Sequence, residues 1–195
     1  MRKCVVILLI VFLNISFGFT STPQKAKKLV EDAIASVIKV IKEEPDLKKG
    51  ARRDKIMSFI SPVFDFNLMA KLSLGKTNWK LFTKEQRKEY TDLFITLLKN
   101  TYLSKAEQFK DEVITFKDPV VNKKKVLVLS TIASKGSTYT IAYKLRLVKE
   151  EWKIYDLEIQ EISIIKSYRN QFGAILKNDT PKDLLKQMRE KFIKS

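Results

Sequence analysis

The chain has 195 residues, a formal net charge of +16 at pH 7, one cysteine and no histidine. Without histidine, Ser-His-Asp and Cys-His nucleophilic schemes and the usual zinc sites each lack an essential member. The positive charge invites a nucleic-acid function, but 31 lysines stand against 7 arginines, and it is the planar fork of arginine that recognises phosphates and base edges bidentately. We expect no nucleic-acid partner.

Residues 1–20 have the pattern of a secretory signal peptide. Arg2 and Lys3 precede an apolar run over residues 5–13, and small residues follow it. The run is shorter than the roughly 20 residues that cross a bilayer, so a retained membrane anchor is the weaker alternative. Cys4 precedes the run, whereas a lipoprotein acceptor would lie at its end. We expect cleavage to leave residues 21–195 as a single exported domain without cysteine.

Three helices are predicted first in chain order. Thr22-Pro23 marks the start of one that ends at Glu44, because proline is well placed at the first helical position. A second, shorter helix follows Gly50 and ends before Ser61-Pro62. Residues 64–74 form a third, with Gly75 as its expected terminator.

A fourth and longer helix is the strongest helical signal. Thr83 and Gln86 form a capping-box pattern just ahead of it. Its apolar stripe is broad and aromatic, which indicates a buried face. The members of that stripe are Tyr90, Leu93, Phe94, Leu97, Leu98, Thr101 and Tyr102.

Alternation then replaces helical spacing and predicts four strands, at residues 113–116, 126–133, 138–148 and 152–162. Their short connections make the last three antiparallel neighbours. Two helices close the chain, at residues 164–177 and 182–192. The predicted fold class is α+β, a four-stranded antiparallel sheet with helices packed over its apolar face.

The segment from Trp152 to Phe172 carries most of the candidate residues. Strand alternation places Tyr155 and Leu157 on an apolar face, with Asp156 on the wet face. Ser163 is the expected N-cap of the following helix. That helix presents Tyr168, Arg169 and Phe172 within two turns.

Few polar residues are candidates for chemistry. Asp156 could act as a general acid or base, or pair with lysine or arginine on the wet face. Asp65 has the same ambiguity, with a helix-start role as the alternative. Arg169 could contact a lipid headgroup or make a structural hydrogen bond. Lysine runs such as residues 123–125 are expected to be solvated turn tips, with attraction to anionic lipid headgroups as the alternative.

Three signatures in this chain resemble the MlaC family of periplasmic phospholipid-binding proteins, also called the toluene-tolerance family. One is a Trp-x-x-Tyr-Asp strand followed by Ile-Ser and a Tyr-Arg-x-Gln-Phe helix, at residues 152–172. The others lie around Phe64-Asp65-Phe66 and along the fourth helix. The resemblance covers nearly all of residues 21–195. Glu161 departs from it, because glycine is expected there in many relatives.

The resemblance implies a soluble, monomeric periplasmic carrier that encloses the acyl chains of a phospholipid and serves outer-membrane lipid asymmetry. It implies no catalysis and no cofactor. The implied partners are an inner-membrane ABC transporter bearing an MCE-domain ring and an outer-membrane lipoprotein complex. The residues predicted to lie near the lipid tails are Phe94, Leu98, Tyr102, Tyr143, Leu145, Tyr155, Leu157, Tyr168 and Phe172.

Three alternatives remain open at this stage. The same family includes proteins assigned to hopanoid transport, so the cargo could differ. Small isomerases that use an Asp and a Tyr share a cone of sheet and helices, although this is an analogy of fold only. Aromatic stripes are also typical of an ordinary filled core, which would make the protein an interaction module without a ligand.

Overall fold

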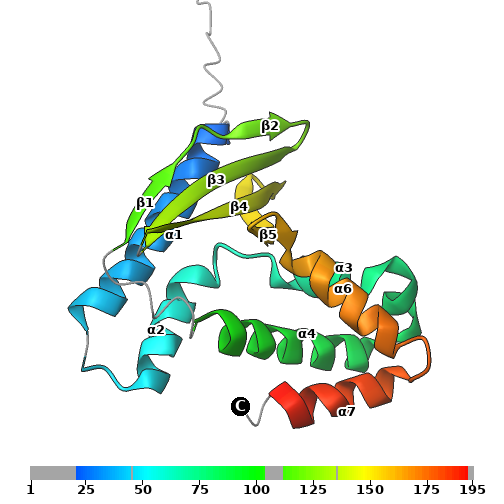
Figure 1. Cartoon of the computed structure of the whole chain (residues 1–195). Coiled ribbons are helices and arrows are strands. Elements are labelled where there is room, and N and C mark those ends of the chain that lie inside the picture. The colour runs from blue at the N-terminus through cyan, green and yellow to red at the C-terminus, as the bar shows by residue number, and fades with distance from the viewer. Residues whose placement is uncertain (1–20, 45, 104–111, 135, 193–195) are drawn as a thin grey trace, which may run out of the picture.

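The computed structural model describes residues 21–44, 46–103, 112–134 and 136–192 (Figure 1). The predicted signal peptide therefore lies outside the described residues. Helix α1 spans Pro23–Glu43, α2 Lys49–Ile60, α3 Phe66–Leu81 and α4 Lys84–Leu98, and a short π-helical turn, η1, follows at Lys99–Leu103. Near the C-terminus lie α6, Ile164–Ile175, and α7, Pro181–Phe192. The predicted helices are thus confirmed.

The caps that the sequence indicated are formed. The hydroxyl of Thr22 accepts from the Lys25 amide at the start of α1, and Thr83 with Gln86 forms the capping box of α4. Gly75 adopts φ 74° and breaks α3, but helical residues resume after it as far as Leu81. The expected stop at Gly75 is therefore a kink, because a single left-handed residue turns the chain and leaves the next turn free to form.

The sheet has six strands rather than the four predicted: β1 Val113–Phe116, β2 Val120–Asn122, β3 Lys125–Ser134, β4 Ser137–Val148, β5 Glu151–Ile159 and β6 Ile162–Ser163. All pairs are antiparallel, in the order β1-β3-β4-β5-β6 with β2 beside β3. The predicted strand over 152–162 divides because Gln160 and Glu161 both have positive φ, the geometry of a tight hairpin turn.

A β-bulge changes which residues of β5 share a face. Lys144 pairs with Asp156, but the next residue, Leu145, pairs with Ile154, so Tyr155 has no residue opposite it in β4. The prediction that Tyr155 lies on the same face as Leu157 is therefore wrong. Ile154 takes its place and is buried. A bulge inserts one extra residue into a strand, which shifts the alternation by one position.

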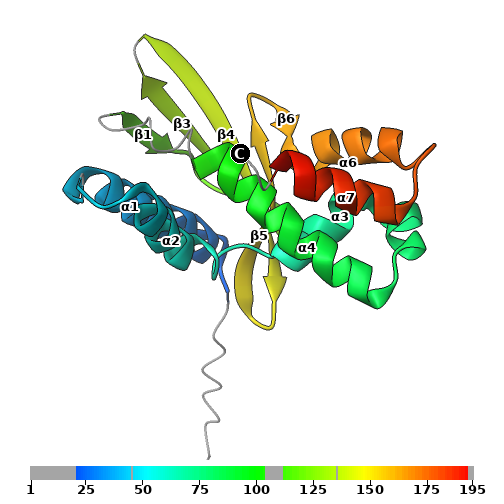
Figure 2. The same ribbon diagram turned by 90° about the horizontal axis from the view of Figure 1, so that it is seen from below.

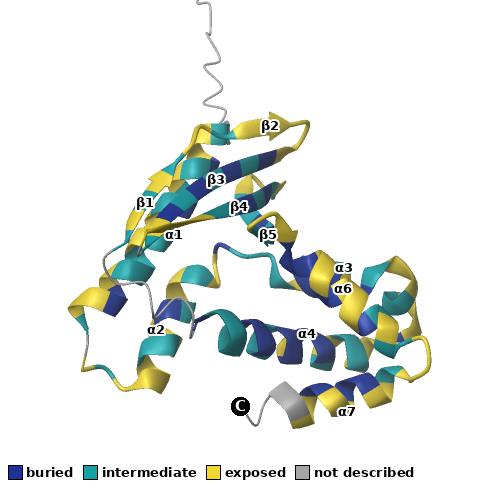
Figure 3. Cartoon of the chain, viewed as in Figure 1, coloured by how far each residue is buried: buried dark blue, intermediate teal, exposed yellow. Residues whose placement is uncertain are grey.

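Apolar side chains gather into two main cores. Figure 2 shows α3, α4, α6 and α7 as one group of helices and α1 with α2 as another, and Figure 3 marks the buried residues in dark blue. The sheet core lies between α1 and the sheet, and its buried residues are Ala26, Val30, Val63, Val126, Val128, Tyr143, Leu145 and Ile154. The helix core is formed by α3, α4, α6 and α7, and its largest buried side chains include Tyr90, Phe82, Phe94, Phe172, Met69 and Met188. A third, smaller cluster joins α1 and α2 to η1.

The segment before α3 attaches the helix core to the sheet. The Asp65 amide donates to the Ile154 carbonyl at 2.8 Å, and the Ile154 amide donates to the Val63 carbonyl at 2.9 Å. The Asp65 carboxylate then accepts from the Leu68 amide at 3.0 Å, which caps α3. Arg146 of β4 donates to the same carboxylate at 2.6 and 3.0 Å. The helix-start role of Asp65 is confirmed.

We predict that Asp65→Ala lowers the free energy of unfolding by about 1–2 kcal/mol, the usual cost of losing an N-cap side chain. The measurement is urea denaturation followed by circular dichroism. Asp32→Ala is the matched control, because Asp32 forms an exposed pair with Lys28 within α1, worth at most about 0.5 kcal/mol. Equal losses in the two variants would contradict the anchoring role of Asp65.

Candidate functional site

The two main cores meet along a seam of partly exposed apolar side chains. Phe64 and Leu157 pack against both cores. The ring of Phe66 stacks on that of Phe64, with 5.4 Å between the centroids. Ile159 follows Leu157 on the same face of β5 and pairs with Ile141 of β4. We call these five residues the interlayer seam.

None of the five seam residues is fully buried, although each packs against at least one core. In a filled junction between two cores, large apolar side chains would be covered on all sides. The seam carries no charged group of its own. Such a surface can contact an apolar ligand, but it has no charged or hydrogen-bonding side chain for a polar ligand.

Four of the predicted tail-contacting residues lie in the helix core: Phe94, Leu98, Tyr168 and Phe172 are all buried there. The ring of Tyr168 meets that of Phe94 edge-on at 5.4 Å and stacks on Phe172 at 5.5 Å. Tyr102 packs against the same core and is only partly buried. Burial, together with the neighbouring Tyr168, raises the pKa of Tyr102 above its usual value.

The predicted residues of the sheet divide among three places. Tyr143 and Leu145 are buried in the sheet core, and Leu157 lies in the seam. Tyr155 belongs to neither core, and the ammonium of Lys125 lies 5.3 Å from the centre of its ring. The aromatic stripe of α4 therefore packs with α3, α6 and α7, while the apolar sheet face packs with α1. The two surfaces belong to different cores, so α4 is not the helix that covers the apolar sheet face.

Four seam residues were missed as candidates: Phe64, Phe66, Ile141 and Ile159. Phe64 and Phe66 flank Asp65 in one of the three signatures, which was the available signal for them. Ile141 and Ile159 follow the alternation of their strands. The alternation does not distinguish a residue at the end of a covered face from a residue at its centre.

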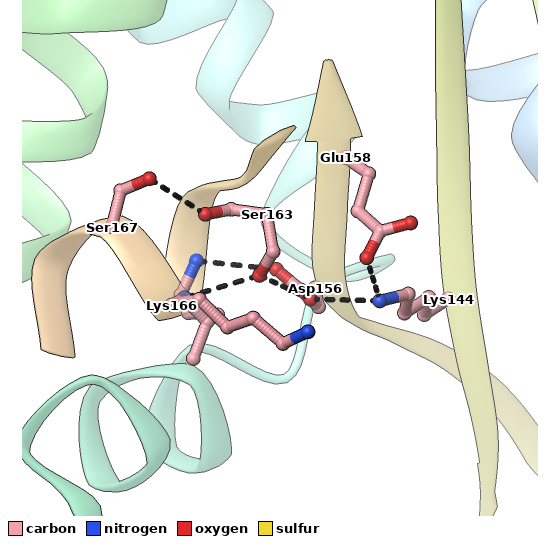
Figure 4. Close-up of polar contacts among 7 residues, drawn as sticks. Lys144, Asp156, Glu158, Ser163, Lys166 and Ser167 are labelled. Atoms are coloured by element: carbon pink, nitrogen blue, oxygen red, sulfur yellow. Dashed lines mark hydrogen bonds and ion pairs between the residues drawn. The ribbon is translucent and has the colours of Figure 1, made fainter. Parts of the chain in front are cut away.

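Asp156 lies in a polar cluster that starts α6 (Figure 4). Its carboxylate accepts from the Ser163 hydroxyl at 2.8 Å and from the Ile165 amide at 3.2 Å, and it pairs with Lys144 at 3.4 Å. The prediction of a wet carboxylate is wrong, since Asp156 is only 6% exposed, but the pairing with lysine is confirmed. Both oxygens have donors within the protein, so the role that the geometry supports is to orient α6.

Lys144 balances two carboxylates on the same side of the sheet. It also donates to Glu158 of β5. Burial acts to lower the pKa of Lys144, but the hydrogen bond to Glu158 and the charges of Asp156 and Glu158 outweigh it, so the pKa lies above the usual 10.5. The lysine therefore stays protonated and holds β4 to β5.

Arg169 makes a structural contact rather than lying free at a pocket mouth. Its Nε donates to the Leu72 carbonyl at 2.7 Å, just before the kink of α3. The Arg169 side chain also lies over Gly75, with its Cδ 3.6 Å from where a Cβ would be. A Cβ placed on Gly173 would lie 3.9 Å from Nδ2 of Asn78 in α3, an ordinary van der Waals distance. Both observations place α6 closely against α3.

A surface hollow of about 730 Å³ lies beside the Asp65–Arg146 pair. Eight of its ten lining residues are polar or charged, among them Lys71 and Arg87, and Trp79 is one of the two others. Arg87 lies over the Trp79 ring and donates to the Trp79 carbonyl at 2.9 Å. This hollow is not the enclosed apolar pocket that was predicted. In the described ranges, no group of three His, Cys, Asp or Glu residues could hold a metal ion.

Comparison with known proteins defines the class to which this arrangement of sheet, helices and seam belongs. A solved structure of a phospholipid-binding protein from Ralstonia solanacearum, in complex with a phospholipid, superposes with a TM-score of 0.79 at 26% identity, covering 87% of this chain and 97% of that one. The toluene tolerance protein ttg2D of Pseudomonas putida is 22% identical over 182 residues, 92% of this chain and 84% of that protein.

The family itself is identified by a match over residues 31–190 to the family described as MlaC protein. The match covers most of the chain. The protein belongs to the MlaC family, and the resemblance read from its three signatures is confirmed.

The buried tyrosines predict how stability depends on pH. Burial raises the pKa of Tyr143 to about 12, against a hydrogen bond from Ser130 that acts to lower it. Because the unfolded chain ionises this group near pH 10, the free energy of unfolding should fall between about pH 10 and 12, by at most about 1.4 kcal/mol per pH unit for one tyrosine. Below about pH 9 the group is neutral in both the folded and the unfolded state, so it does not make the free energy of unfolding depend on pH.

Tyr143→Phe isolates this contribution, because phenylalanine keeps the ring and cannot ionise. Urea denaturation at a series of pH values should give a shallower fall for the variant than for the unmodified chain. Tyr139→Phe is the control, since Tyr139 is an exposed tyrosine of the same strand. Parallel curves for all three proteins would show that Tyr143 is not kept neutral by burial.

Proposed function

We propose that this protein is a periplasmic phospholipid carrier that holds acyl chains at the interlayer seam. The observation that carries the proposal is the seam itself, where apolar side chains of both cores remain partly uncovered. Membership of the MlaC family and the likeness to a structure solved with a phospholipid support it. The predicted residues of the two cores would form the walls on either side of the seam.

The free energy of lipid transfer explains why such a carrier needs an apolar enclosure and little else. Sheltering each CH₂ from water contributes about 0.8 kcal/mol, so one long acyl chain contributes on the order of 10 kcal/mol. The headgroup can stay in water, which removes the need for a dedicated polar site. The absence of charged groups from the seam fits this division, and so does the engagement of both candidate aspartates in structural contacts.

The carrier would act between the two membranes after export. The pattern of residues 1–20 supports export with cleavage of a signal peptide. Among the residues that the structure describes, no helix is long and apolar enough to cross a membrane. We further propose exchange of lipid with an inner-membrane ABC transporter bearing an MCE-domain ring and with an outer-membrane lipoprotein complex. These partners, and a monomeric state, rest on the family resemblance.

A different lipid is the alternative that the seam also accommodates, because an apolar surface does not distinguish an acyl chain from a hopanoid skeleton. The isomerase alternative is less well supported. It needs an aspartate free to move a proton near a tyrosine, whereas Asp156 lies opposite Lys144 and is bonded to Ser163 and the α6 amide. Asp65 is similarly engaged by Arg146.

Native mass spectrometry of the exported protein, followed by lipid extraction, tests the proposal. We expect a mass increment of one phospholipid per chain that is lost on denaturation. Extraction followed by lipid analysis separates phospholipid from hopanoid. A protein with a filled junction would show the polypeptide mass alone, and this result would overturn the carrier function.

The position of the lipid is tested by placing a charge in the seam. Leu157→Arg should reduce lipid retention by tenfold or more, because burying an unpaired charge against acyl chains costs several kcal/mol. Leu147→Arg is the matched control, since Leu147 is exposed on β4. Circular dichroism and thermal unfolding confirm that each variant is folded, and Ile159→Arg replaces Leu157→Arg if it does not fold. Full retention in a folded seam variant would contradict the assignment.

A further inference from the structure

The hairpin of β2 and β3 carries an exposed apolar pair at one end of the molecule (Figure 1). Val120 is 54% exposed and Val121 is 53% exposed. Successive residues of a strand point to opposite sides, so one of the two would normally be covered. Both valine side chains are exposed because β2 pairs only with β3 and forms an outer strand.

Three lysines follow these valines. Lys123 and Lys124 form the turn, and neither has an ion-pair partner within the described part of the chain. Lys125 lies over the Tyr155 ring. Residues 117–125 hold four lysines against the single carboxylate of Asp118, which pairs with Lys27 of α1 at 3.5 Å. The tip is therefore strongly positive as well as apolar.

We propose that the β2–β3 hairpin, residues 120–125, docks the protein onto an anionic lipid surface. Exposed apolar side chains can enter the boundary between headgroups and acyl chains, while lysines beside them meet the negative charge of the headgroups. The long lysine side chains also let the ammonium reach water when the strand lies at that depth. This inference goes beyond the carrier function, because it concerns the outer surface and needs no lipid in the seam.

Protection of a strand edge does not account for both features. Lysines on an outer strand prevent pairing with another sheet, and this explains Lys123 and Lys124. It leaves Val120 and Val121 unexplained, since polar residues would protect the edge equally well. In Figure 1 the hairpin is at the opposite end from α7, so docking through it leaves the helix core facing away from the lipid surface.

Sedimentation with lipid vesicles tests the docking surface. Vesicles of phosphatidylcholine with roughly one third phosphatidylglycerol supply the anionic surface, and pure phosphatidylcholine vesicles supply the neutral one. The double variant Lys123→Asn, Lys124→Gln removes two charges, and asparagine tolerates the positive φ of 56° at residue 123. A second double variant, Val120→Thr with Val121→Thr, keeps β-branching and removes the apolar surface.

The matched control removes two charges elsewhere. Lys76→Gln with Lys80→Gln changes two exposed lysines of α3, away from the hairpin. We expect the hairpin lysine variant to bind anionic vesicles on the order of tenfold more weakly at about 0.15 M salt. The valine variant should also bind several-fold more weakly, and the control should change less than twofold.

Two results would overturn the proposal. Equal losses in the hairpin and control variants would mean that the vesicles respond to overall charge and not to this hairpin. No binding of the unmodified protein to anionic vesicles would also overturn it, and the hairpin would then be left to an acidic protein partner. Lipid content measured by native mass spectrometry is independent of both results. Rejection of the docking surface would therefore not contradict the carrier function.

Discussion

Two aspartates join α3 and α6 of the helix core to the sheet, and this attachment helps to position the two cores that meet at the seam. Asp65 caps α3 while it pairs with Arg146, and Asp156 accepts from the Ile165 amide of α6 while it pairs with Lys144. Arg146 and Lys144 lie on the same face of β4, since they are two residues apart. Each carboxylate therefore joins a helix N-terminus to one strand, and together they set the position of α3 and α6 beside β5.

This attachment leaves the molecule with two separate cores rather than one. Each core buries its own aromatic or branched side chains, so the fold does not depend on complete packing between them. The apolar side chains at the junction can then stay partly exposed without a large loss of stability. A protein that accommodates an apolar ligand needs such a place, because an interior packed throughout to the usual density has no room for an acyl chain.

Much of the fold follows from local patterns. The caps at Thr22, Thr83 and Ser163 were predicted because a side-chain oxygen beside a helical run satisfies amides that have no other partner. Two features of the sheet, a turn and a bulge, were not predicted. Each involves only one or two residues, but its cause cannot be read from those residues. The turn at Gln160-Glu161 lacks the glycine or asparagine that usually marks positive φ, and the bulge at Tyr155 depends on the neighbouring strand.

The sequence alone determined the family, the helices, most strands and the apolar composition of the candidate site, because these depend on the spacing of residues along the chain. Only the tertiary structure decided that the α4 stripe and the sheet face belong to different cores, that Phe64 and Leu157 join them, and that Asp156 is buried. Those facts depend on which distant segments pack together. Alternation along a strand indicates that one face is covered, but it does not identify the segment that covers it.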